Sequence, residues 1–405
     1  MKRGRLSCSL RQGLIFQAYF LSGQKDRARL LAILSVPVLG ILLGRLGDSQ
    51  RCSSTLGSAA WAHGLRTQLA GRYGHDLLLR EDKDVRKTLI FGNGLGMALD
   101  PNLFSLDGAI GRAWEGEGIF DPETRALVRC CLVNDGDTER PHGEDDLDAL
   151  QLVVSSCDFL DRMSQGGAHW LSLHGQQFPA AVRKFLYQTA LQFHQREVVL
   201  PMEFAQPLAA FLHDTHSHVA TLNYDNLLYQ RIIEAYVLRG YGGALVDGML
   251  TAGFACENLE RRQGRTFGYY LHLHGSPLFV DQGGVTRKLA QAELREAGDV
   301  VGSHIVLTHV KHKPTVIAAS PLLQSYWNHL ELALAESEEV ILFGYSGLDT
   351  HLNELLERRS PERIRVVEWQ GAGEQAEREL FWGKSLGKNA TVLRLANVLD
   401  FTEWV

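Results

Sequence analysis

The fold is decided by the stretch V-A-T-L-N-Y-D-N-L-L at Val219–Leu228. Its first four residues are apolar or β-branched and predict a short buried strand, which stops at Asn223. An apolar pattern typical of a helix follows from Leu227. In an open α/β sheet, polar groups at the carboxyl end of a strand face the crevice that binds ligands. Asn223 and Asp225 are therefore candidate ligand-binding residues, unless one of them only caps the next helix.

The composition indicates a globular protein with at least one large core. The chain has 405 residues, of which 45% are hydrophobic, so one to three domains are plausible. Its six cysteines are scattered and form no C-x-x-C pair, so the sequence contains neither a zinc-ribbon nor a dithiol redox motif. We therefore expect a reducing, cytoplasmic compartment and no metal.

The charge is distributed unevenly along the chain. Residues 1–75 contain eleven Lys or Arg and two Asp, whereas residues 76–405 contain 30 basic and 45 acidic residues. The acidic body disfavours a nucleic-acid partner. Because the basic excess belongs to a separate piece, we expect a basic, poorly defined N-terminal appendage at 1–85 and an α/β domain at 86–405.

The N-terminal region contains one apolar run, Leu30–Gly44. It is shorter than the roughly 20 residues of a membrane span, and its basic leader is too long for an ordinary secretory signal. No firm membrane span is predicted. Three interpretations of residues 1–80 stay open: a poorly ordered appendage, a weakly membrane-associating segment, or upstream sequence included by a misplaced start.

Two further strands run into glycine turns. The strand Thr88–Phe91 leads into G-N-G-L-G at Gly92–Gly96, a turn that brings backbone N–H groups close to a phosphate. Taken alone, such a turn is a weak signal, because glycine turns are common. The strand Val340–Phe343 leads into G-Y-S-G-L-D at Gly344–Asp349, where Ser346 and a helix N-terminus suit a ribose or phosphate.

A fourth strand, Phe267–Leu273, ends in His274 and Gly275. Histidine suits acid–base work because its ordinary pKa lies near neutrality, and glycine lets a ligand approach closely. His272 is expected on the same face and is a competing candidate. The alternative for His274 is a simple hydrogen bond to a backbone carbonyl.

Four other histidines raise the question of a metal site: His194, His213, His216 and His218. His216 and His218 would share one face of a strand. No third ligand has a recognisable spacing, so structural roles are favoured.

The order of these elements predicts the fold class. Strands at Arg363–Trp369 and Thr391–Leu395 close the pattern, with helices between successive strands. We predict an α/β fold, a Rossmann-like and mostly parallel sheet with crossover helices. A large helical insertion is expected at about 105–213, where Glu144–Met163 has an amphipathic pattern.

The four strand-end motifs, in this order over roughly residues 86–370, resemble the sirtuin-like NAD-binding domain. The runs L-I-F-G-N-G-L-G-M-A-L-D-P-N-L-F and G-Y-S-G-L-D-T-H-L-N are more similar to bacterial sirtuin-like proteins, and related domains in phage defence hydrolyse NAD. The resemblance implies that NAD is the substrate. It implies these binding residues: Gly92, Asn93, Gly94, Thr221, Gly275, Gly344, Ser346 and Asp349, the last of which is equally a candidate helix cap.

The resemblance also implies the chemistry, which is hydrolysis of the nicotinamide–ribose bond. Asn223 would orient the ribose or the attacking water, His274 would accept a proton, and Asp225 would hold the nicotinamide amide. Protein-deacylating sirtuins carry paired C-x-x-C zinc ligands that this chain lacks, which puts deacylation in doubt. ADP-ribosyl transfer, deacylation and a non-catalytic nucleotide sensor stay open as alternatives.

Unrestrained destruction of NAD would harm the host cell. We therefore expect regulation through a homo-oligomer, a protein partner or a phage-derived trigger, with the helical insertion as a gate or an oligomer contact.

Overall fold

The computed structural model describes residues 86–132, 139–164, 169–194, 198–290, 293–295, 304–307 and 313–404. These residues belong to one compact unit, Lys83–Val405. The predictions about residues 1–85, including the apolar run Leu30–Gly44, lie outside the described residues. Within the described ranges, no helix is long and apolar enough to cross a membrane.

A seven-stranded sheet organises the described residues, with all neighbouring strands parallel and in the order β11-β10-β9-β1-β2-β6-β3. The four central strands β9, β1, β2 and β6 are buried along their whole length. Parallel sheets have this character because helices cover both faces. The predicted α/β, Rossmann-like fold is confirmed. The strands are β1 (Lys87–Phe91), β2 (His218–Thr221), β3 (Leu245–Val246), β6 (Gly268–His272), β9 (Glu339–Phe343), β10 (Arg363–Trp369) and β11 (Thr391–Leu395).

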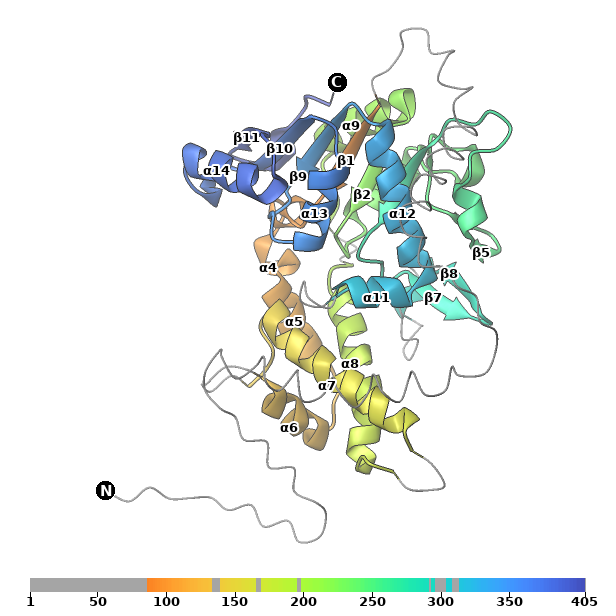
Figure 1. Cartoon of the computed structure of the whole chain (residues 1–405), viewed down its shortest axis with the longest axis vertical. Helices are drawn as coiled ribbons and strands as arrows, with labels where there is room; N and C mark the ends of the chain where they lie inside the picture. Colours follow the sequence, from red (N-terminus) through yellow and green to blue (C-terminus); the bar gives the residue numbers. More distant parts are fainter. Residues whose placement is uncertain are drawn as a thin grey trace, which may run out of the picture. The chain divides into compact units, whose positions relative to one another are not determined.

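Helices connect the strands, and their ends carry recognisable caps. Helix α12 begins at Pro321, and the Ser320 hydroxyl accepts a hydrogen bond from the Leu323 N–H at 3.2 Å. It packs against β6 and β1 and crosses in front of the sheet in Figure 1. Helix α9 (Met202–Thr215) is the last helix of the β1–β2 connection, and the helices after β2 are α10 (Leu227–Glu234), α11 (Lys313–Ala319), α12 (Pro321–Glu336), α13 (Thr350–Arg359) and α14 (Gln375–Leu386).

The region after α10 contains short strands that pair into small sheets. It includes β3 and the antiparallel ribbon β4 (Met249–Leu250) with β5 (Gly253–Phe254). A second ribbon, β7 (Phe279–Gln282) with β8 (Val285–Lys288), follows β6. Short 3-10 helices lie at η2 (Gly240–Gly242), η3 (Cys256–Leu259), η4 (Glu293–Arg295), η5 (Gln370–Ala372) and η6 (Val398–Asp400).

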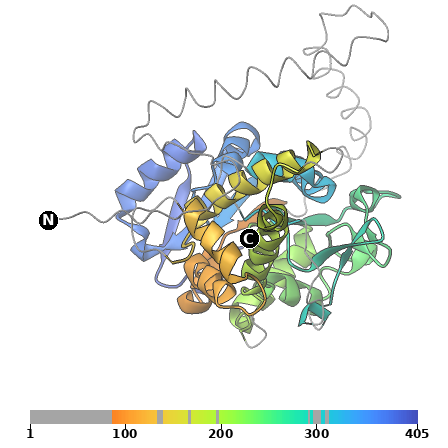
Figure 2. The ribbon, with the colours of Figure 1, turned by 90° about the horizontal axis from the view of Figure 1, so that it is seen from below.

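A helical segment connects β1 to β2 and lies beyond the carboxyl ends of the strands (Figure 1; Figure 2 from below). It has its own hydrophobic core, in which Trp114, Phe120 and Phe185 pack ring against ring. Its helices, before α9, are α3 (Gly94–Met97), α4 (Pro101–Phe104), α5 (Leu106–Trp114), α6 (Pro122–Cys131), α7 (Glu144–Arg162) and α8 (Leu173–Leu191).

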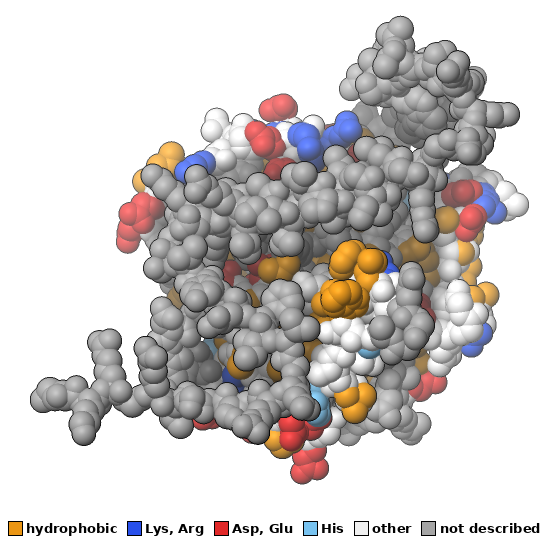
Figure 3. Space-filling view, turned by 60° about the horizontal axis from the view of Figure 1, so that its bottom comes forward, with side chains coloured by type: hydrophobic (Ala, Val, Ile, Leu, Met, Phe, Trp, Pro, Cys, Tyr) orange, Lys and Arg blue, Asp and Glu red, His pale blue; other side chains and the backbone are white. Residues whose placement is uncertain are grey.

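Helix α7 is amphipathic, as its sequence predicts. It buries Leu147, Leu150 and Val154 against the second core. Its outer surface nevertheless exposes Leu152 and Phe159. Figure 3, which looks at this end of the molecule, shows hydrophobic side chains gathered on the visible surface.

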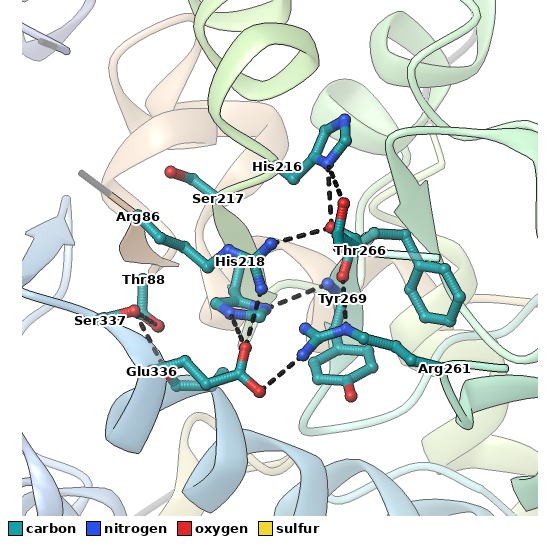
Figure 4. A network of polar contacts seen from close by, with 12 residues as sticks. Arg86, Thr88, His216, Ser217, His218, Arg261, Thr266, Tyr269, Glu336 and Ser337 are labelled. Carbon is teal, nitrogen blue, oxygen red and sulfur yellow. Dashed lines mark hydrogen bonds and ion pairs between the residues drawn. The ribbon is translucent and has the colours of Figure 1, made fainter. Parts of the chain in front are cut away.

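The amino ends of β1 and β2 are joined to the end of α12 by a polar network (Figure 4). The Glu336 carboxylate accepts hydrogen bonds from Arg86 at 2.8 Å and Arg261 at 2.6 Å, and lies 3.3 Å from His218 Nε2. Burial alone would raise the pKa of Glu336, but these neighbours hold it below its usual range. Burial lowers the pKa of His218 to about 4. The network therefore ties three elements together at the end of the sheet opposite the helical segment.

His216 lies outside this strand, so the expectation that His216 and His218 share a strand face was wrong. Helix α9 continues through Thr215, and β2 begins only at His218. His216 ends the helix in the left-handed conformation, and its Nδ1 lies 2.9 Å from the carbonyl oxygen of Thr266.

The glycine turns after β1 and β9 lie backbone against backbone. The Gly92 N–H donates to the Phe343 carbonyl at 2.9 Å, and the Gly94 N–H donates to the Gly344 carbonyl at 2.8 Å. A Cβ atom on Gly94 would lie 2.6 Å from the Gly344 Cα. A side chain larger than hydrogen therefore forces the two strand ends apart.

We expect Gly94→Ala to lower the free energy of unfolding by about 1–3 kcal/mol, because backbone atoms must move to admit the methyl group. Gly383→Ala is the matched control, since Gly383 lies inside α14 with open space around its Cα. There alanine should raise stability by about 0.5–1 kcal/mol. Urea unfolding measures both, and equal stability of the two variants would contradict the packing described.

Candidate functional site

A cavity of about 1080 Å³ lies at the carboxyl ends of the strands. Residues following β1, β2, β6, β9 and β11 line it, together with the last residues of β10. The chain leaves β1 for β2 on one side and later returns to β9 on the other, so the topological switch point lies between β1 and β9. Open α/β sheets bind their ligands in the crevice at this point. The helical segment closes one side of the cavity through Ser105, Leu106 and Glu144.

The glycine turn after β1 lines the middle of this edge with Gly92, Asn93 and Gly94. The N–H groups of Gly92 and Gly94 already donate to the β9 turn, so they are not free for a phosphate. The Asn93 side chain donates to the Phe104 carbonyl at 2.8 Å and holds α4 in place. The turn therefore offers a ligand close approach to the backbone rather than a set of free donors.

Asn223 lines the cavity and carries a buried oxygen without a hydrogen-bond partner among the described residues. Its Nδ2 donates to the Gly92 carbonyl at 3.0 Å, and its backbone N–H donates to the Thr221 hydroxyl at 3.0 Å. Since a carbonyl only accepts, the amide nitrogen must face Gly92 and the oxygen must face away from it. Asn223 is 5% exposed, and among the described residues nothing hydrogen-bonds its Oδ1. A buried acceptor without a partner is costly, which suits an atom that binds a ligand or water.

His274 lines the same cavity and is held from behind by a carboxylate. Its Nε2 lies 3.0 Å from Oδ2 of Asp349. The other ring nitrogen, Nδ1, has no hydrogen-bond partner among the described residues. Because an ionised carboxylate can only accept, Nε2 carries the proton and Nδ1 keeps a free lone pair. The arrangement leaves one nitrogen able to accept a proton.

The protonation of this pair follows from its burial. Burial lowers the pKa of His274 below its usual value, against the opposing effect of the Asp349 hydrogen bond. Burial alone would raise the pKa of Asp349, but the contacts with His274 and Lys313 hold it well below its usual range. At neutral pH the pair is therefore a neutral imidazole beside a carboxylate, the state that a general base requires.

Asp225 does not line the cavity. Its Oδ1 accepts from the Leu227 N–H at 3.0 Å, which forms an Asx turn just before α10. Burial raises the pKa of Asp225 to about 6, and its Oδ2 has no partner among the described residues.

His272, the competing candidate, also lies away from the cavity. It packs among aromatic rings, with ring-centroid distances of 4.8 Å to Tyr229 and 5.1 Å to Phe279. Neither ring nitrogen hydrogen-bonds a described group, and burial lowers its pKa to about 3. Strand β6 ends at His272, and the chain turns at once, so only His274 reaches the cavity.

The buried, neutral His272 makes the protein sensitive to acid. Below pH 6.5 the unfolded chain binds a proton at this histidine that the folded protein excludes, so stability falls as the pH falls. We expect His272→Phe to remove this loss, which is worth about 2 kcal/mol between pH 7 and pH 5. Denaturant unfolding at the two pH values measures it. An unchanged pH dependence of stability in His272→Phe would refute the assignment.

Gly275 has a different role from the one expected. It has φ of +79°, and a Cβ atom there would overlap the carbonyl oxygen of His304. Gly275 lets the backbone after β6 approach the backbone of residues 304–306. There the Val306 N–H donates to the His274 carbonyl at 3.0 Å. Gly275 therefore fixes the position of His274.

The β9 turn contributes Gly344, Ser346 and Asp349 to the cavity. Ser346 is exposed, and its Oγ accepts from the Leu348 N–H at 3.3 Å. Asp349 caps α13 and also meets His274, so it lies beside the proposed base rather than apart from it.

Several cavity residues were missed by sequence reasoning. Lys313 and Glu144 come from α11 and α7, and their positions depend on how those helices pack. Glu368 and Arg378 form an ion pair at 2.7 Å at the far end. Glu368 could have been predicted from the sequence, because it is an acidic residue near the carboxyl end of a correctly predicted strand.

The histidines considered for a metal have other partners. His194 Nε2 lies 2.7 Å from the Tyr224 carbonyl oxygen, and His213 lies 3.0 Å from the Asp214 carboxylate. Within the described ranges, no cluster of His, Cys, Asp and Glu has an arrangement that could hold a metal ion.

No protein-family model matches this chain, and no curated protein matches it. Among solved structures, the chain is similar to one described under "Structural Basis for the Mechanism and Regulation of Sir2 Enzymes". The two share 13% sequence identity, with a TM-score of 0.37 and coverage of 78% of this chain and 90% of that chain. A likeness at this level is no basis for assigning an activity.

Proposed function

We propose that this protein consumes NAD by hydrolysing the bond between nicotinamide and ribose, releasing nicotinamide and ADP-ribose. One observation carries the proposal: Asn223, whose Oδ1 has no hydrogen-bond partner among the described residues, and His274, whose Nε2 is bonded to Asp349, line one cavity at a topological switch point. A group that positions a hydroxyl or water and a group that accepts its proton are the two requirements of this hydrolysis.

The shape of the cavity supports a dinucleotide. From β10 to β6 the edge of the sheet spans four strand spacings, or roughly 19 Å. Asn223 and His274 lie towards the β2–β6 end, the glycine turns lie in the middle, and Glu368 lies at the β10 end. A ligand with a ring system at each end and a pyrophosphate between them matches this order.

The proposed reaction needs little help for its leaving group. Nicotinamide is cationic in NAD and leaves neutral, taking the electrons of the bond to the ribose C1′. The demanding part is the oxocarbenium-like ribose that remains. A water oxygen forms the new bond to C1′, oriented by Asn223, and gives its proton to Nδ1 of His274. The proton then passes to solvent.

The remaining residues have supporting roles in this proposal. The Thr221 hydroxyl accepts a hydrogen bond from the backbone N–H of Asn223 and so holds that residue in place. Gly275 fixes the position of His274. Gly92, Asn93 and Gly94 admit the pyrophosphate against the backbone, while Gly344 and Ser346 meet the adenosine half. Contact between Asp225 and the nicotinamide amide requires the end of β2 to rearrange, because Asp225 does not line the cavity as it stands.

Mass spectrometry of the products distinguishes hydrolysis from its alternatives. Purified protein incubated with NAD should give free ADP-ribose in equal amount to nicotinamide. ADP-ribose attached to protein would indicate transfer, and an acylated ADP-ribose would indicate deacylation. Binding of NAD without any product, in every oligomeric state tested, would instead support a sensor.

We propose further that this activity is restrained in the cell and serves anti-phage defence in a bacterium. The reason for the restraint is chemical, since unregulated loss of NAD stops metabolism. The helical segment is the place for control, because Glu144 of α7 lines the cavity. Full activity of a purified monomer without any trigger would count against this part of the proposal.

A further inference from the structure

Three hydrogen-bond donors from three elements converge on the Asp349 carboxylate. Oδ2 accepts from His274 Nε2 at 3.0 Å and from Lys313 Nζ at 3.0 Å, and Oδ1 accepts from the Leu352 N–H at 3.1 Å. Helix capping accounts for the Leu352 contact alone. A buried lysine and a cavity histidine sharing one oxygen need another explanation.

The backbone of Asp349 is held rigidly by its neighbours. It is 4% exposed, and the Tyr345 hydroxyl accepts from its N–H at 3.1 Å and donates to its carbonyl at 3.0 Å. The same hydroxyl lies 2.8 Å from Oδ1 of Asn353, whose amide donates to the Gly347 carbonyl. With its backbone fixed on both sides, the carboxylate has little freedom to follow a moving imidazole.

Lys313 is an unusual residue to find here. It is 3% exposed, whereas lysine is almost never buried without a charged partner. Besides Asp349, its Nζ lies 3.9 Å from the Glu144 carboxylate of α7. Among the described residues, the charged and titratable groups that act on His274 or contact its ring are Asp349 at the start of α13, Lys313 on α11, Glu144 on α7, and Tyr224 after β2.

We propose that Asp349 and Lys313 are positioning residues for His274. The carboxylate fixes the ring with its N–H at Nε2, and the lysine cation balances the charge of the carboxylate, so that the imidazole stays neutral with Nδ1 open to the cavity. This inference rests on the proposed function, in which His274 is the base. It adds that α11 and α7 act on that base through Lys313.

The sign of the effect follows from charge. Without the lysine cation, the His274–Asp349 pair carries a net negative charge when the imidazole is neutral, and it takes up a proton more readily. Lys313→Gln keeps a donor and removes the charge, so it should raise the pKa of His274 by about one unit or more. Glu144→Gln removes a negative charge and should shift the pKa in the opposite direction, by less, because that carboxylate is farther away and more exposed.

The experiment is nitrogen NMR of histidine-labelled full-length protein across pH 4–9, with the His274 signals identified by their loss in His274→Gln. We expect wild type to show the neutral form protonated at Nε2, Lys313→Gln to titrate about one unit higher, and Glu144→Gln to titrate lower. The matched control is Lys288→Gln, because Lys288 pairs with Asp247 at 3.1 Å outside the cavity. This control should leave His274 unchanged.

A second readout separates this inference from the proposed function. If NAD is hydrolysed, the acidic limb of the pH–rate profile should shift to higher pH in Lys313→Gln, and the rate should recover at high pH. A merely structural defect would not produce this recovery. Expected NMR shifts without NAD turnover in any oligomeric state tested would leave the positioning role standing and remove the proposed function. An unshifted His274 titration in folded Lys313→Gln, or a wild-type ring protonated at Nδ1, would overturn the inference.

Discussion

Replacing His274 by alanine is expected to slow the release of nicotinamide from NAD by about 10²–10⁴-fold, the usual contribution of a general base. His274 is the histidine whose ring lines the cavity with a nitrogen left free by its hydrogen bond to Asp349. The loss should appear in kcat, because the base acts on the attacking water in the transition state rather than on bound NAD.

The matched control for this variant is His272→Phe. His272 lies two residues earlier but packs among Tyr229, Tyr270 and Phe279, away from the cavity. The rate of nicotinamide release by this control should stay within a few-fold of wild type. If His272→Phe abolished the reaction while His274→Ala preserved it, the assignment of the base would be wrong.

Asn223→Ala should be nearly as damaging, with a loss of about 10²–10³-fold in kcat, comparable to removal of one preorganised polar group in other enzymes. The amide does two things at once. Its Nδ2 bonds the Gly92 carbonyl and so fixes the orientation of the amide, while its buried Oδ1 has no hydrogen-bond partner among the described residues and is left to bind the ligand.

Asn258→Ala provides the comparison. Asn258 also donates its Nδ2 to a backbone carbonyl, that of Gly248 at 2.9 Å, but it does not line the cavity. Both variants lose one structural hydrogen bond, so their difference in rate isolates the contribution of the side-chain oxygen of Asn223. Equal rates of nicotinamide release in the two variants would show that Asn223 has no part in the reaction.

The sequence predicted the fold because its signals are local. Each central strand is short, fully buried and rich in apolar, β-branched or aromatic residues, and the apolar run stops at a glycine or polar residue, as at Phe91–Gly92 and Phe343–Gly344. Parallel pairing then brings all the carboxyl ends to one edge, whatever the details of the connections. For this reason the sequence alone places Asn223, His274 and Ser346 at the same edge of the sheet.

The partners of these residues could not be predicted, because they depend on packing over long stretches of chain. Asp349 meets His274 across 75 positions in the sequence, and Lys313 joins them from α11. The direction in which a side chain points after the end of a strand is equally hard to predict from the sequence. Asp225, two residues after Asn223, turns back to the start of α10 instead of facing the cavity.

Incubation of the purified full-length protein with NAD, beside His274→Ala, tests the central claim most directly. Chromatography measures nicotinamide and ADP-ribose over time in both samples. We predict equal amounts of the two products from the wild-type protein and at least about 10²-fold less from the variant. Equal product release by the variant and the wild type would contradict the account, because the reaction would then proceed without the group proposed as its base.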